Sequence, residues 1–212
     1  MRKEFTERGE PQRRAGAAVG VLFMGVVVAL LIQAKWGDRA GILQTGMDIG
    51  VGLLVLAMLG WPPWKRIIRD SGNASSLFSR LGIGVIGGCV GFAFAWVYLF
   101  AVLSLVGGDV EGTPVEVPWW TVVILAPVVE EWLLRGVAWE ALRRIGPQRT
   151  VLFGTALLFA MMHGLGGGGW LEFPHRFVGG LVLGMVRIRT GALWPCVLAH
   201  FVWNGLAVYL LD

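Results

Sequence analysis

Charged side chains are scarce in this 212-residue chain, and their scarcity is the first constraint on its class. Lys, Arg, Asp and Glu make up 15% of the residues, against about 25% in a typical soluble domain. Cysteine is rarer still, with two residues, which excludes a disulfide scaffold. So few charges also argue against a soluble globular enzyme, because its surface needs many polar groups.

Apolar residues are abundant instead. They make up 56% of the chain, and glycine adds a further 32 residues. This hydrophobicity excludes a disordered chain. At about 20 residues per span, the length leaves room for roughly six to eight membrane-spanning helices. We therefore expect an all-α, polytopic integral membrane protein, located as a multi-pass protein in the cell (plasma) membrane.

Seven apolar runs predict seven transmembrane helices. The runs cover residues 17–34, 41–61, 81–106, 119–145, 150–164, 175–188 and 192–211. A polar stretch over residues 1–16 precedes them and is expected to be a cytoplasmic N-terminal tail. The first run is too long for a typical signal-peptide core, and no small-x-small cleavage site follows it, so we interpret it as a retained span.

Positive charges alternate between the two predicted sides of the membrane. The tail and every second loop together hold 14 Lys and Arg residues, the other loops hold 3, and Arg135 lies within a helix. An excess of Lys and Arg marks cytoplasmic loops, so we expect a cytoplasmic N-terminus. Because these clusters account for the net charge of +4, and no basic stripe is interleaved with aromatics, we expect no nucleic-acid partner.

Three charged residues lie inside the fourth apolar run, where an unpaired charge is costly and indicates a functional site. Glu131 and Arg135 stand at i and i+4 on one helix face and can form an ion pair. Glu130 is turned by about 100° from Glu131, and its own i+4 position is Leu134. Glu130 is therefore the unpaired carboxylate and a candidate general base.

Two of the three histidines fall in later apolar runs. Phe159 and His163 are spaced i, i+4, as are His200 and Asn204, so each pair projects from one helix face. A spare carboxylate with two histidines and an amide can form a water-activating site, with or without a metal ion. A structural ion pair with packed histidines is the alternative.

These residues resemble the motifs of the CAAX-processing and bacteriocin-processing family of intramembrane proteases, also called CPBP or Abi. The family includes the type II CAAX prenyl endopeptidases. Its EExxxR motif corresponds to Glu130–Arg135, FxxxH to Phe159–His163 and HxxxN to His200–Asn204. The resemblance covers about residues 118–204. We accordingly divide the chain into supporting transmembrane helices over 17–117 and family-like catalytic helices over 118–212.

The resemblance implies an intramembrane endopeptidase that hydrolyses peptide bonds of membrane-associated or prenylated-type peptide substrates. In that family the residue matching Glu130 would activate water, and the one matching His163 would help to hold it. His200 and Asn204 would stabilise the oxyanion of the tetrahedral intermediate. The supporting residues would be Glu131, Arg135 and Phe159. Membrane lipids and a membrane-associated peptide or protein are the expected partners.

The family has also been described as metalloproteases, which makes Glu130, His163 and His200 candidate ligands for one divalent metal ion such as zinc. The chain has no HExxH motif, so the template of soluble zinc proteases does not apply. Asn204 suits an oxyanion donor better than a zinc ligand, which favours water activated by glutamate. A non-proteolytic bacteriocin-immunity or scaffold protein and a small proton-coupled transporter are the alternative functions.

Overall fold

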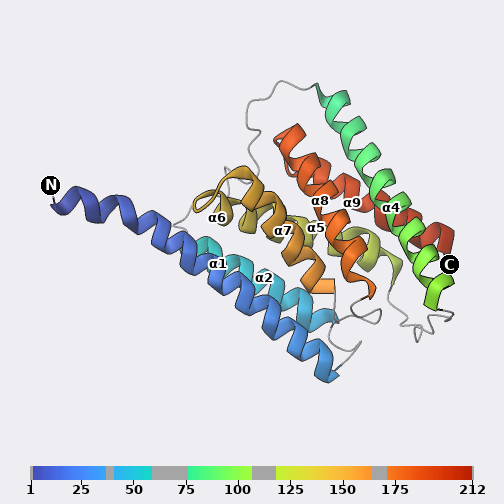
Figure 1. The fold of residues 1–212 in the computed structure, drawn as a ribbon, viewed down its shortest axis with the longest axis horizontal. Coiled ribbons are helices and arrows are strands. Elements are labelled where there is room, and N and C mark those ends of the chain that lie inside the picture. The colour runs from blue at the N-terminus through green and yellow to red at the C-terminus, as the bar shows by residue number, and fades with distance from the viewer. Residues whose placement is uncertain (1, 37–40, 59–75, 107–117, 164–170, 212) are drawn as a thin grey trace.

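The computed structural model describes residues 2–36, 41–58, 76–106, 118–163 and 171–211, and helices joined by short turns make up these ranges. Within those ranges there is no strand, so the all-α prediction is confirmed for this part of the chain. Figure 1 shows the arrangement, and the helices in chain order are α1 (Arg2–Trp36), α2 (Gly41–Met58), α4 (Leu77–Val106), η2 (Thr121–Leu125), α5 (Ala126–Glu131), η3 (Trp132–Ala138), α6 (Trp139–Arg143), α7 (Gln148–His163), α8 (Phe173–Thr190) and α9 (Trp194–Leu211).

Most helices agree with the predicted runs to within a few residues at each end. The clear difference is α1, which begins at Arg2 and continues through the predicted tail, residues 1–16. Eight of its 16 residues are Glu, Arg or Lys, which are good helix formers even where no apolar run exists. The prediction from hydrophobicity covered the apolar part of α1 but not its polar beginning, which projects beyond the bundle in Figure 1.

The predicted fourth helix is present over residues 119–143, but it is not a uniform α-helix. Two π-helical segments, η2 and η3, flank the short α5. In η2 the N–H of Ala126 bonds the carbonyl of Thr121, five residues back. Pro127 then stands in the first turn of α5, where its missing N–H prevents a regular ladder. Such π turns are frequent at functional sites.

The segment from η2 to α6 lies centrally among the other helices. On one side it packs against α1 and α2, and on the other against α7 and α9. The remaining helices pack as the pairs α1 with α2, α4 with α9, α4 with α8 and α7 with α8. Side chains projecting from η2 to α6 can therefore meet those of α7 and α9 inside the bundle.

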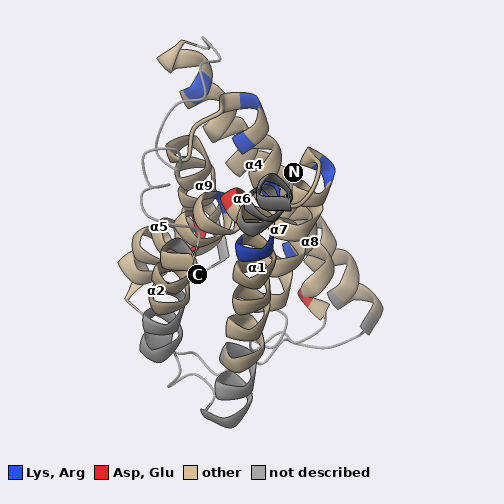
Figure 2. Cartoon of the chain, turned by 90° about the vertical axis from the view of Figure 1, so that its left-hand side faces the viewer, with Lys and Arg blue, Asp and Glu red and all other residues tan. Residues whose placement is uncertain are grey.

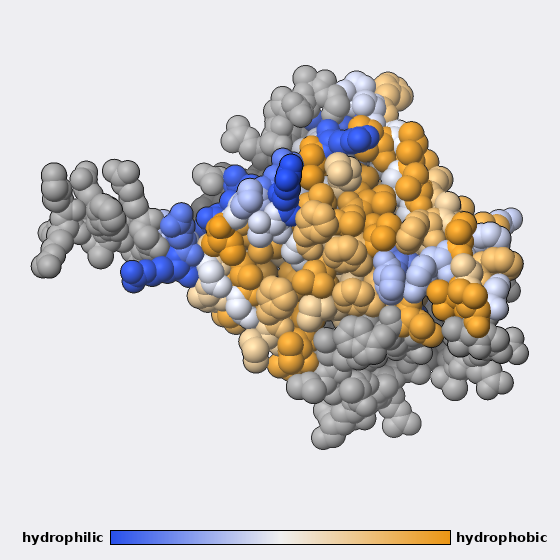
Figure 3. Space-filling view, in the orientation of Figure 1, coloured by the Kyte–Doolittle hydropathy of each residue, from blue (hydrophilic) through white to orange (hydrophobic). Residues whose placement is uncertain are grey.

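The outer face of α4 is apolar. Phe78, Ile86 and Phe100 are each more than 60% exposed, and Figure 3 shows apolar residues over much of the visible face of the molecule. Among the described helices, one stretch is long and apolar enough to cross a membrane, Leu77–Val102 in α4. Large exposed apolar patches of this kind mark contact with a membrane or a partner.

Lys and Arg gather toward one end of the bundle, in the upper half of the view in Figure 2. Arg80 lies near the start of α4, Arg143 at the end of α6 and Arg189 near the end of α8. These three arginines belong to loops that the sequence assigned to the same side of the membrane. Which side of the membrane these residues face stays a prediction from the alternating loops.

Candidate active site

Three helices bring the motif residues together. Glu130 and Glu131 are the last residues of α5, His163 is the last residue of α7, and His200 lies within α9. Glu131 and His200 are 69 positions apart in the chain and yet in hydrogen-bond contact. The sequence motifs therefore converge on one place in the bundle.

The ion pair expected inside the fourth helix is present and fully buried. Nη1 of Arg135 donates to Oε1 of Glu131 at 2.9 Å, and neither side chain is exposed to solvent. Nη2 of Arg135 donates to the backbone carbonyl of Gly180 on α8 at 2.8 Å. A β-carbon at Gly180 would lie 2.8 Å from the Cα of Ala156, so glycine allows α8 to approach α7 there. Arg135 thus joins the central segment to α8.

His200 stands between the two glutamates. Its Nδ1 lies 3.0 Å from Oε1 of Glu131, and because a carboxylate accepts, we assign the proton to Nδ1. Its Nε2 lies 4.0 Å from Oε2 of Glu130. Both ring nitrogens of His200 therefore face carboxylate oxygens.

His163 approaches Glu130 from the other side. Its Nδ1 lies 2.8 Å from the carbonyl oxygen of Phe159, which can only accept, so a neutral ring donates from Nδ1 and presents the Nε2 lone pair. That Nε2 lies 3.7 Å from Oε2 of Glu130. The backbone of α7 thus selects which nitrogen of His163 enters the site.

Oε2 of Glu130 is the point on which the site converges. Among the described residues it is buried and has no hydrogen-bond partner. The two nitrogens that face it, at 3.7 and 4.0 Å, are beyond direct hydrogen-bond range. Polar groups at this spacing are commonly bridged by a water molecule. The side chains of Glu130 and His163 are 17% and 20% exposed, so other atoms of these residues lie at the edge of the site while Oε2 is buried.

Phe159 fills the space beneath these groups. Its side chain is fully buried, and its ring centroid lies 4.6 Å from that of His163 and 5.5 Å from that of His200. The guanidinium carbon of Arg135 lies 5.0 Å from the same ring centroid. Phe159 therefore packs against both histidine rings, and its supporting role stays a prediction.

Asn204 makes a contact away from Glu130. Its Nδ2 donates to the backbone carbonyl of Val122 in η2 at 2.9 Å, and no hydrogen bond joins it to Glu130 or His163 within the described ranges. Glu130, His163 and His200 thus meet at one point, whereas Asn204 contacts the beginning of the same segment. Its predicted role at an oxyanion stays a prediction.

Three backbone carbonyls are partners of the site that the sequence did not indicate. They belong to Phe159, which accepts from His163, Gly180, which accepts from Arg135, and Val122, which accepts from Asn204. A backbone acceptor carries no signal in residue type. For Val122 alone the sequence held an indication, Pro127, because a proline within a helix leaves carbonyls of the preceding turn without a donor.

The donor atoms match the chemistry of a divalent metal site, although their spacing is wide. One carboxylate oxygen and two imidazole nitrogens form a common zinc set, and the Nδ1 contacts of both histidines are the supporting contacts that such ligands use. Zinc bonds of about 2.0–2.2 Å bring neighbouring ligand atoms to roughly 3.3 Å in a tetrahedron. Glu130, His163 and His200 would have to close by about half an ångström, and no described cluster already holds three ligands.

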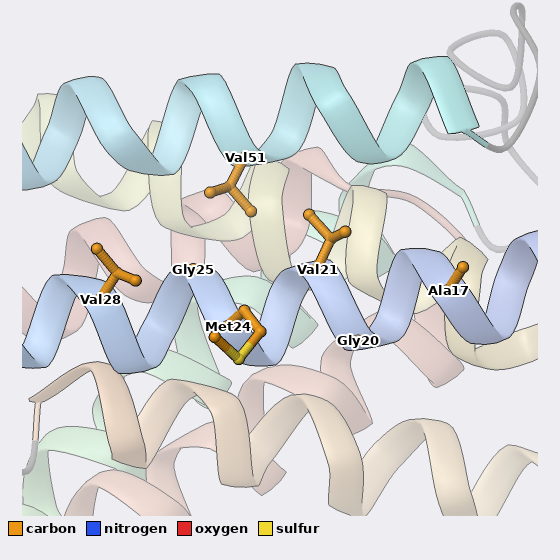
Figure 4. A pocket seen from close by; sticks show the side chains of 7 residues that line it. All are labelled: Ala17, Gly20, Val21, Met24, Gly25, Val28 and Val51. Carbon is orange, nitrogen blue, oxygen red and sulfur yellow. The ribbon is translucent and has the colours of Figure 1, made fainter.

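A separate groove between α1 and α2 contains none of these groups. Figure 4 shows its lining, which is apolar or glycine throughout: Ala17, Gly20, Val21, Met24, Gly25, Val28 and Val51. At Gly25 an added β-carbon would lie 2.7 Å from a methyl group of Val51. The groove therefore belongs to the packing of two helices and offers no acid, base or metal ligand.

Comparison with protein families agrees with this site. The family model described as type II CAAX prenyl endopeptidase Rce1-like matches residues 114–206, which include all three motifs. Over these residues the chain is similar to the CAAX protease family. No curated protein and no solved structure matches the chain significantly. The CAAX protease match covers the central segment and α7 to α9 and leaves α1, α2 and α4 outside it.

Proposed function

We propose that this protein is a multi-pass intramembrane endopeptidase of the plasma membrane, with its N-terminus in the cytoplasm. Its substrates would be membrane-associated or prenylated-type peptides, and lipids would surround it. The observation that carries the proposal is the unsatisfied Oε2 of Glu130, faced at 3.7 and 4.0 Å by nitrogens of His163 and His200. A carboxylate so placed can take a proton from a water molecule held beside it.

In the proposed reaction, water lies between Glu130 and His163. Nε2 of His163 accepts one hydrogen bond from the water, while Glu130 removes the other proton as the oxygen attacks the scissile carbonyl carbon. The carbonyl oxygen becomes an oxyanion, which protonated Nε2 of His200 stabilises. The intermediate then collapses, the C–N bond breaks, and Glu130 returns its proton to the leaving amine.

The buried groups around the site support this sequence of events. Glu131 accepts hydrogen bonds from Nδ1 of His200 and from Nη1 of Arg135. A positive charge on the ring of His200 would therefore have a carboxylate beside it. Two carboxylates and one guanidinium leave the cluster one negative charge in excess, which a proton on His200 would cancel. The buried charges of Glu131 and Arg135 are paired with each other, which lowers the cost of keeping both away from water.

A divalent metal ion such as zinc is a second way to activate the same water. Glu130, His163 and His200 would hold it. Bound there, it would supply Lewis-acid polarisation of the water and of the carbonyl oxygen. Glu131 and Arg135 would orient His200 in the same way.

The test uses purified protein in liposomes with quenched fluorescent peptides, one prenylated and one an unmodified membrane peptide. Glu130→Gln should reduce kcat by roughly 10²–10⁴-fold. Glu140→Gln, which alters a pair outside the site, should leave kcat within about twofold. Cleavage that survives Glu130→Gln would reject the mechanism. A proton-coupled flux that Glu130→Gln abolishes, without any cleavage by the wild type, would support a transporter instead.

Metal dependence is checked on the same samples. Zinc content is measured in the wild type and in a His163→Ala, His200→Ala double variant, and activity is measured before and after chelation. A stoichiometric metal that the double variant lacks, together with loss of activity on chelation, would support the metal route. Full activity in metal-free protein would support water activated by Glu130 alone.

A further inference from the structure

The HxxxN residue Asn204 has a contact that its expected role does not explain. We propose that Asn204 is a positioning residue: it supplies the hydrogen bond that Pro127 removes from the central helix, and so sets where Glu130 stands. The proposal rests on the endopeptidase function above. It assigns Asn204 to the backbone of the enzyme and away from the oxyanion of the substrate.

The carbonyl of Val122 has no backbone donor within its own helix. In an α-helix the donor would be the N–H of Ala126, but that N–H bonds Thr121. In the π register the donor would be residue 127, which is proline and has no N–H. The helix therefore leaves the carbonyl of Val122 without a partner, a costly state inside a membrane.

Asn204 meets this need directly. Its Nδ2 donates to the Val122 carbonyl at 2.9 Å, a normal length for such a bond. The two residues are 82 positions apart, so only the packing of α9 against η2 brings them together. The amide N–H used in this way is not directed at Glu130.

Two hydrogen bonds join α9 to the central segment. This helix holds the central segment at two points, where Asn204 bonds Val122 and His200 bonds Glu131. The later residue of α9 contacts the earlier residue of the segment, so the two run antiparallel. Glu130 lies between the two points and next to the second. Its distance from His200 therefore depends on both bonds.

The test is a double-mutant cycle with Pro127, because alanine at 127 restores an N–H in register with the Val122 carbonyl. We expect Asn204→Ala to lower kcat about tenfold in the wild-type background with KM nearly unchanged. In the Pro127→Ala background the same substitution should cost no more than about threefold. An equal loss in both backgrounds would overturn the proposal, because an oxyanion donor acts independently of residue 127.

A second measurement does not require activity and separates the failure of this proposal from the failure of the proposed function. Amide hydrogen exchange over residues 121–131 should speed up about tenfold in Asn204→Ala and in Asn204→Asp, which keeps the shape but loses the N–H donor. It should return to near the wild-type rate in Pro127→Ala, Asn204→Ala. Glu130→Gln, inactive but with both bonds intact, should exchange like the wild type. Unchanged exchange in the Asn204 variants would overturn the proposal even if peptide cleavage is confirmed.

Discussion

At the residue scale, two Glu–Arg pairs with similar spacing differ sharply in burial. Glu131 and Arg135 are both fully buried, whereas Arg143, which pairs with Glu140, is 53% exposed. Removing one partner of a buried pair leaves an uncompensated charge, which is far more costly than losing a pair in water. Similar sequence patterns therefore carry different energetic weight.

We expect Arg135→Leu to destabilise the protein by about 3–5 kcal/mol. The substitution leaves the buried charge of Glu131 without its ion-pair partner and the carbonyl of Gly180 without its hydrogen-bond donor. Arg143→Leu should cost about 0–1 kcal/mol. Unfolding in a mild detergent, followed by tryptophan fluorescence, measures both. Equal losses for the two variants would show that the Glu131–Arg135 pair is not buried as described. Replacing Glu131 by Gln together with Arg135 by Met should recover part of the loss.

At the element scale, glycines determine how closely the helices approach. Gly179 on α8 lies directly under the indole of Trp203 on α9, and a β-carbon there would overlap the ring. Trp203 also lies 6.1 Å from His200, measured between ring centroids. A change in this packing would therefore move the histidine that faces both glutamates.

Gly179→Ala is expected to destabilise the protein by about 1–3 kcal/mol through overpacking and to lower kcat by displacing His200. Gly82→Ala is the matched control, because nothing lies within 4 Å of a β-carbon at that position of α4, and it should be neutral or stabilising by up to about 1 kcal/mol. Thermal unfolding and peptide cleavage are measured for both. If Gly179→Ala behaves like the control, the α8–α9 contact is looser than the structure has it.

The two π turns also belong to this scale. They interrupt the regular α-helix on either side of α5, the segment that carries Glu130 and Glu131. The sequence predicted the extent of this helix from hydrophobicity, which is insensitive to a change from α to π bonding. Pro127 was its one local indication.

At the scale of the whole molecule, the apolar face in Figure 3 and the Lys and Arg residues gathered in the upper half of Figure 2 agree with a membrane protein. α7, α8 and α9 have 16, 18 and 18 residues, slightly fewer than the roughly 20 needed for a full span. Interfacial tryptophans and local thinning of the bilayer can accommodate helices of this length.

We expect reporters fused to the two ends of the chain to lie on opposite sides of the membrane, with the N-terminus cytoplasmic, as seven spans and the 14-to-3 charge split require. Paired fusions to a cytoplasmic fluorophore and a periplasm-active phosphatase measure this. An even number of spans, with both ends on one side, would contradict the predicted topology. Reversing the charges at Arg13 and Arg14 should weaken the orientation.

The sequence by itself determined the helical class, most helix boundaries and the candidate site residues. Helices follow from local composition and periodicity, and a charge such as Glu130 is conspicuous inside an apolar run. The i, i+4 spacing of Glu131 and Arg135 was enough to predict their ion pair, because both residues lie on one helix.

Only the tertiary structure decided which atoms face each other. The approach of His163 and His200 to the same oxygen of Glu130, the carbonyl of Gly180 beneath Arg135 and the bond from Asn204 to Val122 all join different helices. Such contacts depend on how helices pack over separations as large as 82 residues. Backbone carbonyls are identical in every residue, so their partners are chosen by this packing and leave no trace in residue type.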